Sequence, residues 1–250
     1  MILILFSKTD MENKEDFLKG LDKSFFDDGY KIADLYLING LTKENLFNAQ
    51  RHLYKAIDDF NEAFLKKVSA DGKPTECKKG CSTCCHQTVL ATPYELFYLA
   101  DFLKKKFRED ALGKIVERAE NKKKSTSKLK IDELLRYKEE CPLIHSEEGF
   151  CRAYQARPMA CRIYLSSSVK SCIDDLANPY DDNIFPELYD LPLRFGRMMN
   201  EGFHARVRKG KEKTLQAFES TIEEGLITAL KAESFFNWIN EKKVFRKIVE

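Results

Sequence analysis

The segment Cys77-Lys-Lys-Gly-Cys81-Ser-Thr-Cys84-Cys85-His86 places four cysteines within nine residues. The remaining four cysteines are Cys141, Cys151, Cys161 and Cys172, so all eight lie between positions 77 and 172 of a 250-residue chain. Short spacings of this kind let a tight turn direct several thiolates at one point, and Gly80 is the permissive residue that such a turn needs. The pattern predicts a cysteine-rich centre that is organised by zinc or iron.

The adjacent pair Cys84-Cys85 limits how the thiolates can be shared. Neighbouring side chains in extended backbone point to opposite faces. The pair is therefore expected to serve two metals, one metal and a structural contact, or a compact cluster. Eight thiolates suffice for two zinc sites of four cysteines each, or for one iron–sulfur cluster with a partner site. Thiolate softness alone does not distinguish zinc from iron.

Two plainer interpretations of the cysteines are weaker. Eight ordinary buried thiols would rarely gather four within nine residues, although free cysteine is often buried. Disulfides need an oxidising compartment, and the apolar start MILILF (residues 1–6) lacks the basic region and cleavage site of a secretory signal. That start is read as a short strand or a tail, with Met1 or Met11 as the first residue. We expect a cytoplasmic protein without a membrane span.

Periodic apolar residues on both sides of the cysteines predict helices. Residues 14–38 and a longer stretch from a Thr42 cap to Asp71-Gly72 repeat near 3.6 residues, which gives an N-terminal helical flank, 1–72. Residues 73–175 form the cysteine-rich region and residues 176–250 a C-terminal helical flank. Strand signals are weak throughout. The predicted fold is mainly α, with helical bundle flanks around an irregular, metal-organised centre, in one compact domain.

Within these regions the sequence also predicts individual helix starts and loops. Thr92-Pro93-Tyr94-Glu95 predicts a helix start, with Thr92 as the cap and Glu95 completing a capping box. The polar, lysine-rich segment 121–130 is predicted to be a loop between two helices. In the C-terminal flank, an apolar helical stripe is predicted to begin at Leu215 and to continue to Ile239.

The order of these motifs resembles the bacterial and archaeal CxxCxxCC family of zinc- or iron-chelating domains. That family combines a C-x2-C-x2-C-C run, a helix opening on Glu, a C-P-F/L-L motif, C-x-I-Y-x-x-R-P-x-x-C-R and a last cysteine. The matching residues here are Cys77, Cys81, Cys84, Cys85, Glu95, Cys141, Pro142, Leu143, Cys151, Tyr154, Arg157, Pro158, Cys161, Arg162 and Cys172. One departure is C-x3-C in place of the first C-x2-C. The resemblance implies metal binding by the eight cysteines, and no settled reaction.

Residues beside the cysteines are candidates for supporting roles. His86 and His145 could each complete a site of three cysteines and one histidine, but with eight thiolates present we expect them to support or surround the site. Arg157 and Arg162 are expected to donate to thiolate or carbonyl groups and to offset thiolate charge; the alternative is an anion or substrate clamp. Tyr154 is a candidate for the same supporting or anion-binding role as these two arginines.

Two enzyme classes share part of the pattern. Cys77, Cys81 and Cys84 have the cluster-binding spacing of radical S-adenosylmethionine enzymes, but the alternating strands and helices of their barrel are missing. Flagellin lysine N-methylases carry a similar cysteine cluster, and an iron–sulfur enzyme of that kind stays an alternative.

Interaction modules form a third class. The 42 basic and 40 acidic residues nearly balance, which argues against a surface built for nucleic acid. The basic window 194–213 and the acidic stretch 174–190 are read as solvated faces, and no aromatic side chains alternate with the basic ones. Nucleic-acid binding is therefore not favoured. The stripe Phe235, Phe236, Trp238 and Ile239 is read as core, or as a docking face for a protein partner or a second copy.

Overall fold

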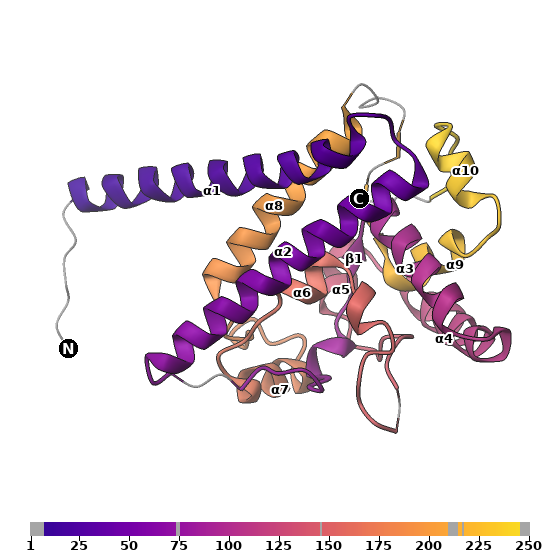
Figure 1. The fold of residues 1–250 in the computed structure, drawn as a ribbon. Helices are drawn as coiled ribbons and strands as arrows, with labels where there is room; N and C mark the ends of the chain where they lie inside the picture. The colour runs from indigo at the N-terminus through magenta and orange to yellow at the C-terminus, as the bar shows by residue number, and fades with distance from the viewer. Residues whose placement is uncertain (1–7, 74–75, 146, 210–214, 217, 246–250) are drawn as a thin grey trace.

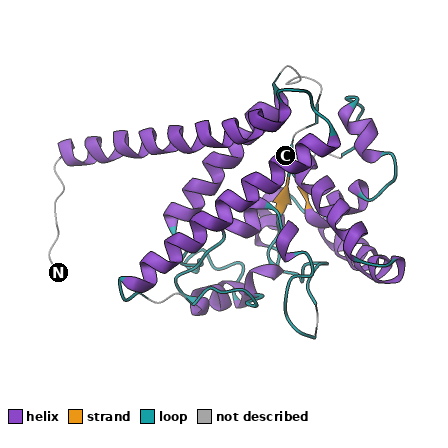
Figure 2. Cartoon of the chain, viewed as in Figure 1, coloured by secondary structure: helices purple, strands orange, loops and turns teal. Residues whose placement is uncertain are grey.

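The computed structural model describes residues 8–73, 76–145, 147–209, 215–216 and 218–245, with the backbone alone for residues 8–14. In this part of the chain, ten α-helices, two short 3-10 helices and one two-stranded sheet are present (Figures 1 and 2). The prediction of a mainly α fold is confirmed. The predicted strand or tail at residues 1–6 lies outside the described residues.

The elements follow one another in the order α1 (Lys8–Leu37), α2 (Lys43–Ala70), η1 (Thr83–His86), β1 (Leu90–Ala91), α3 (Pro93–Lys106), α4 (Glu109–Thr126), α5 (Ile131–Arg136), η2 (Tyr154–Ala156), α6 (Met159–Ile163), α7 (Val169–Ala177), α8 (Asp190–Arg208), β2 (Ser220–Thr221), α9 (Ile222–Ala229) and α10 (Ser234–Ile239). Among the described helices, none combines the length and the apolar character that crossing a bilayer would need.

Helix α2 begins and ends where the sequence predicts, whereas α1 ends near the predicted stop but begins at Lys8, before the predicted start at residue 14. The Thr42 hydroxyl accepts a hydrogen bond from the backbone N–H of Asn45 at 3.2 Å and caps α2. Gly40 and Gly72 have φ angles of 113° and 73°, which a residue with a Cβ rarely adopts, so the chain turns just after each helix.

Helices α1 and α8 cross in direct backbone contact (Figure 1). A Cβ added to Gly29 would lie 1.9 Å from the carbonyl oxygen of Met199, and one added to Gly202 would lie 1.9 Å from that of Phe26. Two ion pairs also join α8 to α1: Arg194 contacts Asp22 at 2.7 Å, and Arg206 contacts Asp34. The basic window of the sequence thus partly pairs with acidic residues of α1, in place of the solvated face that was expected.

Replacing Gly29 by Ala is expected to lower the free energy of unfolding by about 2 to 3 kcal/mol, because the obstructing atoms belong to the α8 backbone and cannot rotate away. Gly20→Ala in the same helix is the matched control, since a Cβ there meets nothing within 4 Å. That variant should gain up to about 1 kcal/mol from helix propensity. Urea unfolding of both variants measures the difference, and equal effects would contradict the close contact.

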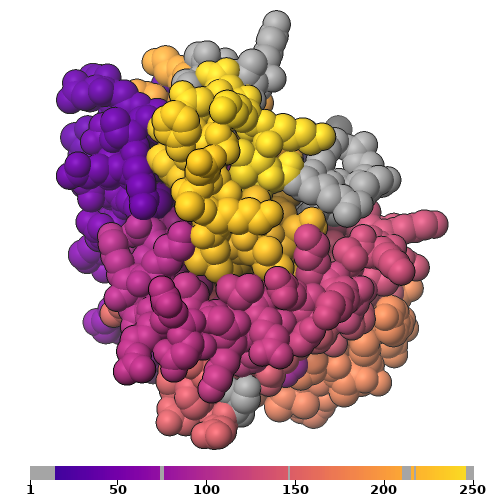
Figure 3. Space-filling model, turned by 90° about the vertical axis from the view of Figure 1, so that its right-hand side faces the viewer, coloured from indigo at the N-terminus to yellow at the C-terminus, as the bar shows by residue number. Residues whose placement is uncertain are grey.

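One hydrophobic core takes side chains from α1 to α4, α6 and α8 to α10. Leu53 of α2, Leu99 of α3, Phe203 of α8 and Trp238 of α10 are each fully buried in it. The C-terminal helices lie against α3 and α4, as the face in Figure 3 shows. The predicted core role of the C-terminal stripe holds for Trp238, whereas Phe236 is 65% exposed.

Two local predictions were wrong. Segment 121–130 is helical up to Thr126, because Lys122 and Thr126 are buried and anchored: the Lys122 ammonium donates to the Glu139 carbonyl and the Thr126 hydroxyl to Glu223. The predicted stripe from Leu215 is not one helix. Ser220–Thr221 instead pairs antiparallel with Leu90–Ala91, and the Thr221 hydroxyl then caps α9.

His204 of α8 packs against the ring of Tyr94, with ring centroids 6.0 Å apart. Burial, helped by the charge of Arg208, lowers the pKa of its imidazole from the usual 6.5 to about 4. His52, by contrast, is exposed and contacts the Tyr36 hydroxyl.

The low pKa of His204 predicts a pH-dependent stability. The unfolded chain binds this proton below about pH 6.5 and the folded chain only near pH 4, so stability is lost as the pH falls through this interval. Between pH 7.5 and 5 we expect a loss of about 2 kcal/mol that His204→Gln abolishes and His52→Gln does not. Denaturant unfolding at both pH values tests this, and a parallel loss in all three proteins would rule it out.

Candidate metal centre

The first cysteine loop folds into a turn and a short helix. Gly80 adopts a φ of 98°, and the N–H of Cys81 donates to the Lys78 carbonyl across the turn. The next residues form η1, so Cys84 and Cys85 sit on helical backbone and not on an extended strand. Their thiols are consequently neighbours that share a hydrogen bond, whereas extended backbone would have separated them.

The second cysteine segment is tied to the first through the backbone. The N–H of Cys141 donates to the Cys85 carbonyl at 2.8 Å, and that of Glu139 to the His86 carbonyl at 2.9 Å. A bridge between Ile144 and Cys151 then folds the chain back on itself. These bonds bring Cys141 and Cys151, far along the chain, beside Cys85.

Glu95 positions the helix that carries Cys161. Its carboxylate accepts the N–H and the hydroxyl of Thr92, both at 2.9 Å, as the capping box predicts. The other carboxylate oxygen accepts the N–H of Met159 at 2.7 Å and the hydroxyl of Tyr54 at 3.1 Å. One buried carboxylate therefore joins α2, α3 and the start of α6, which fixes Cys161 relative to the core.

Cys172 lies on α7. Ser168 caps this helix, and the Glu76 carboxylate accepts the N–H of Val169 at 2.8 Å in its first turn. Because Glu76 directly precedes Cys77, this contact places the first cysteine of the chain beside the last. Helix α7 also packs against η1.

The eight thiols line two adjoining cavities. The smaller one, of about 30 Å³, is lined by Cys77, Cys81, Cys84 and Cys172, which we call the outer quartet. The larger one, of about 200 Å³, is lined by Cys85, Cys141, Cys151 and Cys161, which we call the inner quartet. Cys77, Cys81 and Cys84 line this larger cavity as well. The adjacent cysteines Cys84 and Cys85 thus fall in different quartets.

The thiols that shift one another's pKa values mostly belong to the same quartet. Burial is the main cause that raises the pKa of Cys77, and the other three outer thiols raise it further, against a hydrogen bond from the Ser166 backbone. Burial likewise raises the pKa of Cys161 strongly, and Cys141, Cys84 and Cys151 add to the rise. Cys84 contributes to the pKa shifts of thiols in both quartets.

Burial raises the pKa of most of these thiols, which favours their protonated form. Burial raises the pKa of Cys141 to about 12, and that of Cys151 rises for the same reason. The hydrogen bond with Cys85 lowers the pKa of Cys84 to about 7 and raises that of Cys85. A metal that binds here must displace several protons, so its affinity is expected to rise with pH.

The donor chemistry fits zinc or iron. Thiolates are the soft ligands that both metals accept, and a tetrahedral site takes four of them. Within the described ranges, no three His, Cys, Asp or Glu side chains already surround one point as an ion requires.

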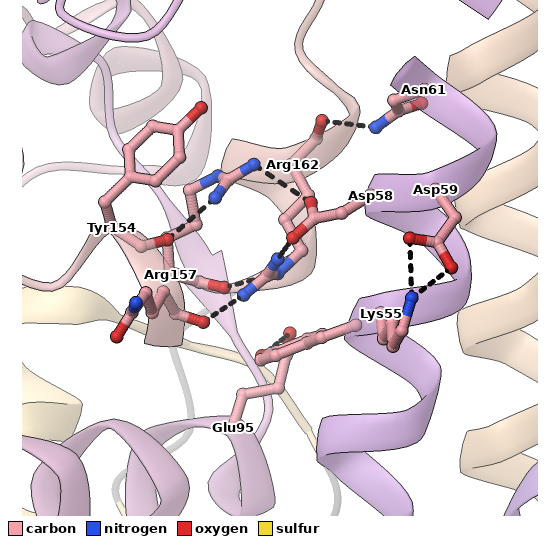
Figure 4. A network of polar contacts seen from close by, with 10 residues as sticks. Lys55, Asp58, Asp59, Asn61, Glu95, Tyr154, Arg157 and Arg162 are labelled. Atoms are coloured by element: carbon pink, nitrogen blue, oxygen red, sulfur yellow. Dashed lines mark hydrogen bonds and ion pairs between the residues drawn. The ribbon is translucent and has the colours of Figure 1, made fainter. Parts of the chain in front are cut away.

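Arg157 and Arg162 meet at a carboxylate that the sequence did not reveal, Asp58 of α2 (Figure 4). Arg162 is fully buried, stacks 3.9 Å from the Tyr54 ring and donates to the carbonyls of Arg157 and Gln155. Both arginines thus donate to carbonyl groups. Arg157 also lines the larger cavity and lowers the pKa of Cys84.

Two cations lie close to the ring of Tyr154 at the larger cavity. The Arg157 guanidinium lies 3.9 Å and the Lys79 ammonium 5.3 Å from the centre of its ring. The two histidines are placed apart from the thiols. The Nδ1 atom of His86 lies 3.3 Å from the Thr83 carbonyl oxygen, and His145 stacks on Phe150. Neither histidine lines the two thiol cavities.

The sequence contained no signal for Asp58, which adjoins Asp59 on a helix and reads as a solvated position. Gln87 and Tyr164 were also not predicted from the sequence. Gln87 donates to the Tyr164 hydroxyl at the wall of the larger cavity, and Tyr164 lines the smaller cavity as well. Side chains of this kind become functional only through tertiary contact.

Residues 76–178 match the CxxCxxCC family. The family is described as "Putative zinc- or iron-chelating domain", and the match supports metal binding by this CxxCxxCC segment. It begins one residue before Cys77 and ends beyond Cys172, so it spans both quartets. No curated protein and no solved structure matches the chain.

Proposed function

We propose that the chain is a metalloprotein that holds two metal centres, one in each cysteine quartet, with zinc or iron as the metal. The observation that carries the proposal is that four thiols line the smaller cavity, whereas the larger cavity is lined by four others that the smaller one lacks. The outer quartet, around about 30 Å³, suits a single ion closed in by four thiolates. Zinc or iron bound there would hold the loop of Cys77 to α7.

The inner quartet supports a second candidate, an iron–sulfur centre. Its cavity of about 200 Å³ exceeds what one ion with four thiolates fills, since a water molecule occupies about 30 Å³ in the liquid. A cluster with its inorganic sulfide would occupy more of this volume. When bound, such a cluster would supply redox chemistry, as the alternative of an iron–sulfur methylase requires. A reducing, cytoplasmic setting stays our expectation for these free thiols.

Single substitutions in each quartet test the two-centre arrangement. We expect anaerobically purified protein to contain two zinc ions, or one zinc with several irons and sulfide. Cys172→Ser should remove the outer metal alone and Cys161→Ser the inner metal alone, because each variant deletes one of four ligands. Elemental mass spectrometry and the visible spectrum measure the loss.

Matched histidine variants serve as controls. His86→Gln and His145→Gln should leave the metal content unchanged, since neither histidine lines a cavity. Loss of all metal in both cysteine variants would indicate one shared cluster. Retention of the full metal content in both would show that the quartets are not the ligands.

A further inference from the structure

A groove separate from the two thiol cavities lies between α4 and the loop that follows the Ile144–Cys151 bridge. Its volume is about 330 Å³. The side chains that line it are Asp110, Ala111, Lys114, Ile115, Arg118 and Arg152. The first five recur at a spacing that places them on one face of α4, and Arg152 lines the opposite wall. Among the described residues, no cysteine lines this groove.

Hydrogen bonds hold the two walls of the groove together. The Arg118 guanidinium donates to the Ile144 carbonyl at 2.7 Å and to the Glu140 carboxylate at 2.9 Å. Lys106, the last residue of α3, donates to the Arg152 carbonyl at 2.8 Å. The loop is thus tied to both α3 and α4, and the charge of Arg118 is already balanced by a carboxylate.

The other two cations of the groove have no counter-ion. Within the described part of the chain, no carboxylate pairs with Lys114 or Arg152, and no acceptor bonds to the Arg152 guanidinium. Arg152 is partly buried, and its Nε atom is shielded from water. Asp110, the carboxylate on the wall, is exposed and lies 3.6 Å from Arg108. Because a partly buried guanidinium without an acceptor is costly, an anion in the groove would be stabilising.

The surface around the groove is basic as well. Residues 104–130 contain eleven basic and four acidic residues, in a chain whose net charge is only +2. This segment covers the end of α3 and all of α4. Such a concentration of positive charge attracts anions and raises their local concentration at the groove.

The arrangement of the two unpaired cations suits a phosphate group. Lys114 and Arg152 lie on opposite walls, and a phosphate presents three acceptor oxygens in different directions, whereas a carboxylate presents two in one plane. Ala111 and Ile115 add an apolar part to the lining. A volume of about 330 Å³ is at the lower end of the usual range for small-molecule sites, about 300 to 1,000 Å³.

We infer that this groove binds a small phosphorylated organic molecule. Its phosphate oxygens accept from Lys114 and Arg152, and its organic part lies along Ala111 and Ile115. No covalent bond is made or broken on binding. The inference does not rest on the metal centres, since no thiol among the described residues lines the groove.

Isothermal titration calorimetry on the full chain at low ionic strength tests this site, with glycerol 3-phosphate as the probe. Glycerol has the same carbon skeleton without the charge, acetate has a carboxylate in place of the phosphate, and a short thymidine oligonucleotide is a polyanion. We expect one saturable site for glycerol 3-phosphate, binding of acetate that is weaker by about tenfold or more, and no binding of glycerol.

Removal of the two unpaired cations tests their role. Lys114→Gln with Arg152→Gln should weaken the binding of glycerol 3-phosphate by about tenfold or more, because the charged donors are lost. Lys104→Gln with Lys128→Gln is the matched control, since it removes the same charge from exposed positions that do not line the groove. Its effect should stay below about twofold.

The melting temperature of each double variant shows whether it is folded. If Arg152→Gln disturbs folding, Lys114→Gln alone, at an exposed position of α4, should still weaken binding by about threefold. An unchanged affinity in that single variant would contradict the site.

Three other results would overturn the inference. Equal weakening in the two double variants, with tight binding of the oligonucleotide, would show a diffuse attraction of polyanions to the basic surface. Acetate that binds as tightly as glycerol 3-phosphate would remove the preference for phosphate. Absence of saturable binding would show that the groove is not a site. The proposed function is tested by metal content, so its failure would be a separate result.

Discussion

Removal of the bound metal is expected to unfold the two segments that carry the cysteines, residues 76–90 and 139–178, and to leave the α1, α2 and α8 helices folded. Few regular elements hold these segments: η1, η2 and α6 have only three to five residues each. A structural zinc site of thiolates contributes an apparent 10 to 16 kcal/mol, roughly, at pH 7. That is comparable to the entire stability of an ordinary domain, about 5 to 15 kcal/mol.

The long helices do not depend on that contribution. The α1–α8 crossing and the buried face of α2 are apolar contacts and ion pairs outside the quartets. Hydrogen exchange with mass spectrometry, before and after chelation, should show lost protection in 76–90 and 139–178 only. Chelator added together with excess zinc is the control and should leave protection intact. Unchanged exchange after complete removal of the metal would show that the segments fold without it.

The second large effect is expected at Asp58. Replacing it by Ala leaves the fully buried Arg162 without its carboxylate partner, and Arg157 loses the same partner (Figure 4). Breaking a buried ion pair from one side costs about 3 to 5 kcal/mol, because the remaining charge is not solvated. Since 41% of the Asp58 side chain is exposed, we expect the lower end of this range.

Asp59→Ala provides a matched control in the same turn of α2. Asp59 pairs with Lys55 at 2.6 Å on an exposed face, and an exposed pair of this spacing contributes about 0.3 to 0.5 kcal/mol. Urea unfolding compares the two variants. A double variant, Asp58→Ala with Arg162→Met, should recover much of the loss, because the fully buried charge of Arg162 is removed as well and only Arg157, 13% exposed, is left without the carboxylate. If both aspartate variants behave alike, Arg162 is not held by Asp58.

For Asp58→Ala we also expect weaker metal binding by the inner quartet. Arg162 directly follows Cys161, and its guanidinium donates to the backbone carbonyls of Gln155 and Arg157. Loss of its counter-ion should loosen the segment that carries Cys151 and Cys161. The metal content of the variant, measured beside its stability, would separate this effect from general destabilisation, since Gly29→Ala lowers stability at a site away from the thiols.

The sequence alone determined the helical flanks, the helix caps and the gathering of the thiols into one segment. Each of these follows from residues close in the chain: a 3.6-residue apolar repeat, a Thr or Gly at a helix end, or four cysteines in nine positions. The cysteine motifs also carried the family resemblance that the match to residues 76–178 confirms. Sequence patterns suffice to predict features that depend only on the backbone geometry of neighbouring residues.

Tertiary structure decided how those parts meet. Which thiols share a cavity depends on η1 placing Cys84 and Cys85 side by side and on α7 returning Cys172 to Cys77. The role of Asp58, the junction made by Glu95 and the backbone contact at Gly29 join residues far apart in the chain. Charge pairing and close packing depend on distance in space, and one sequence does not contain that distance.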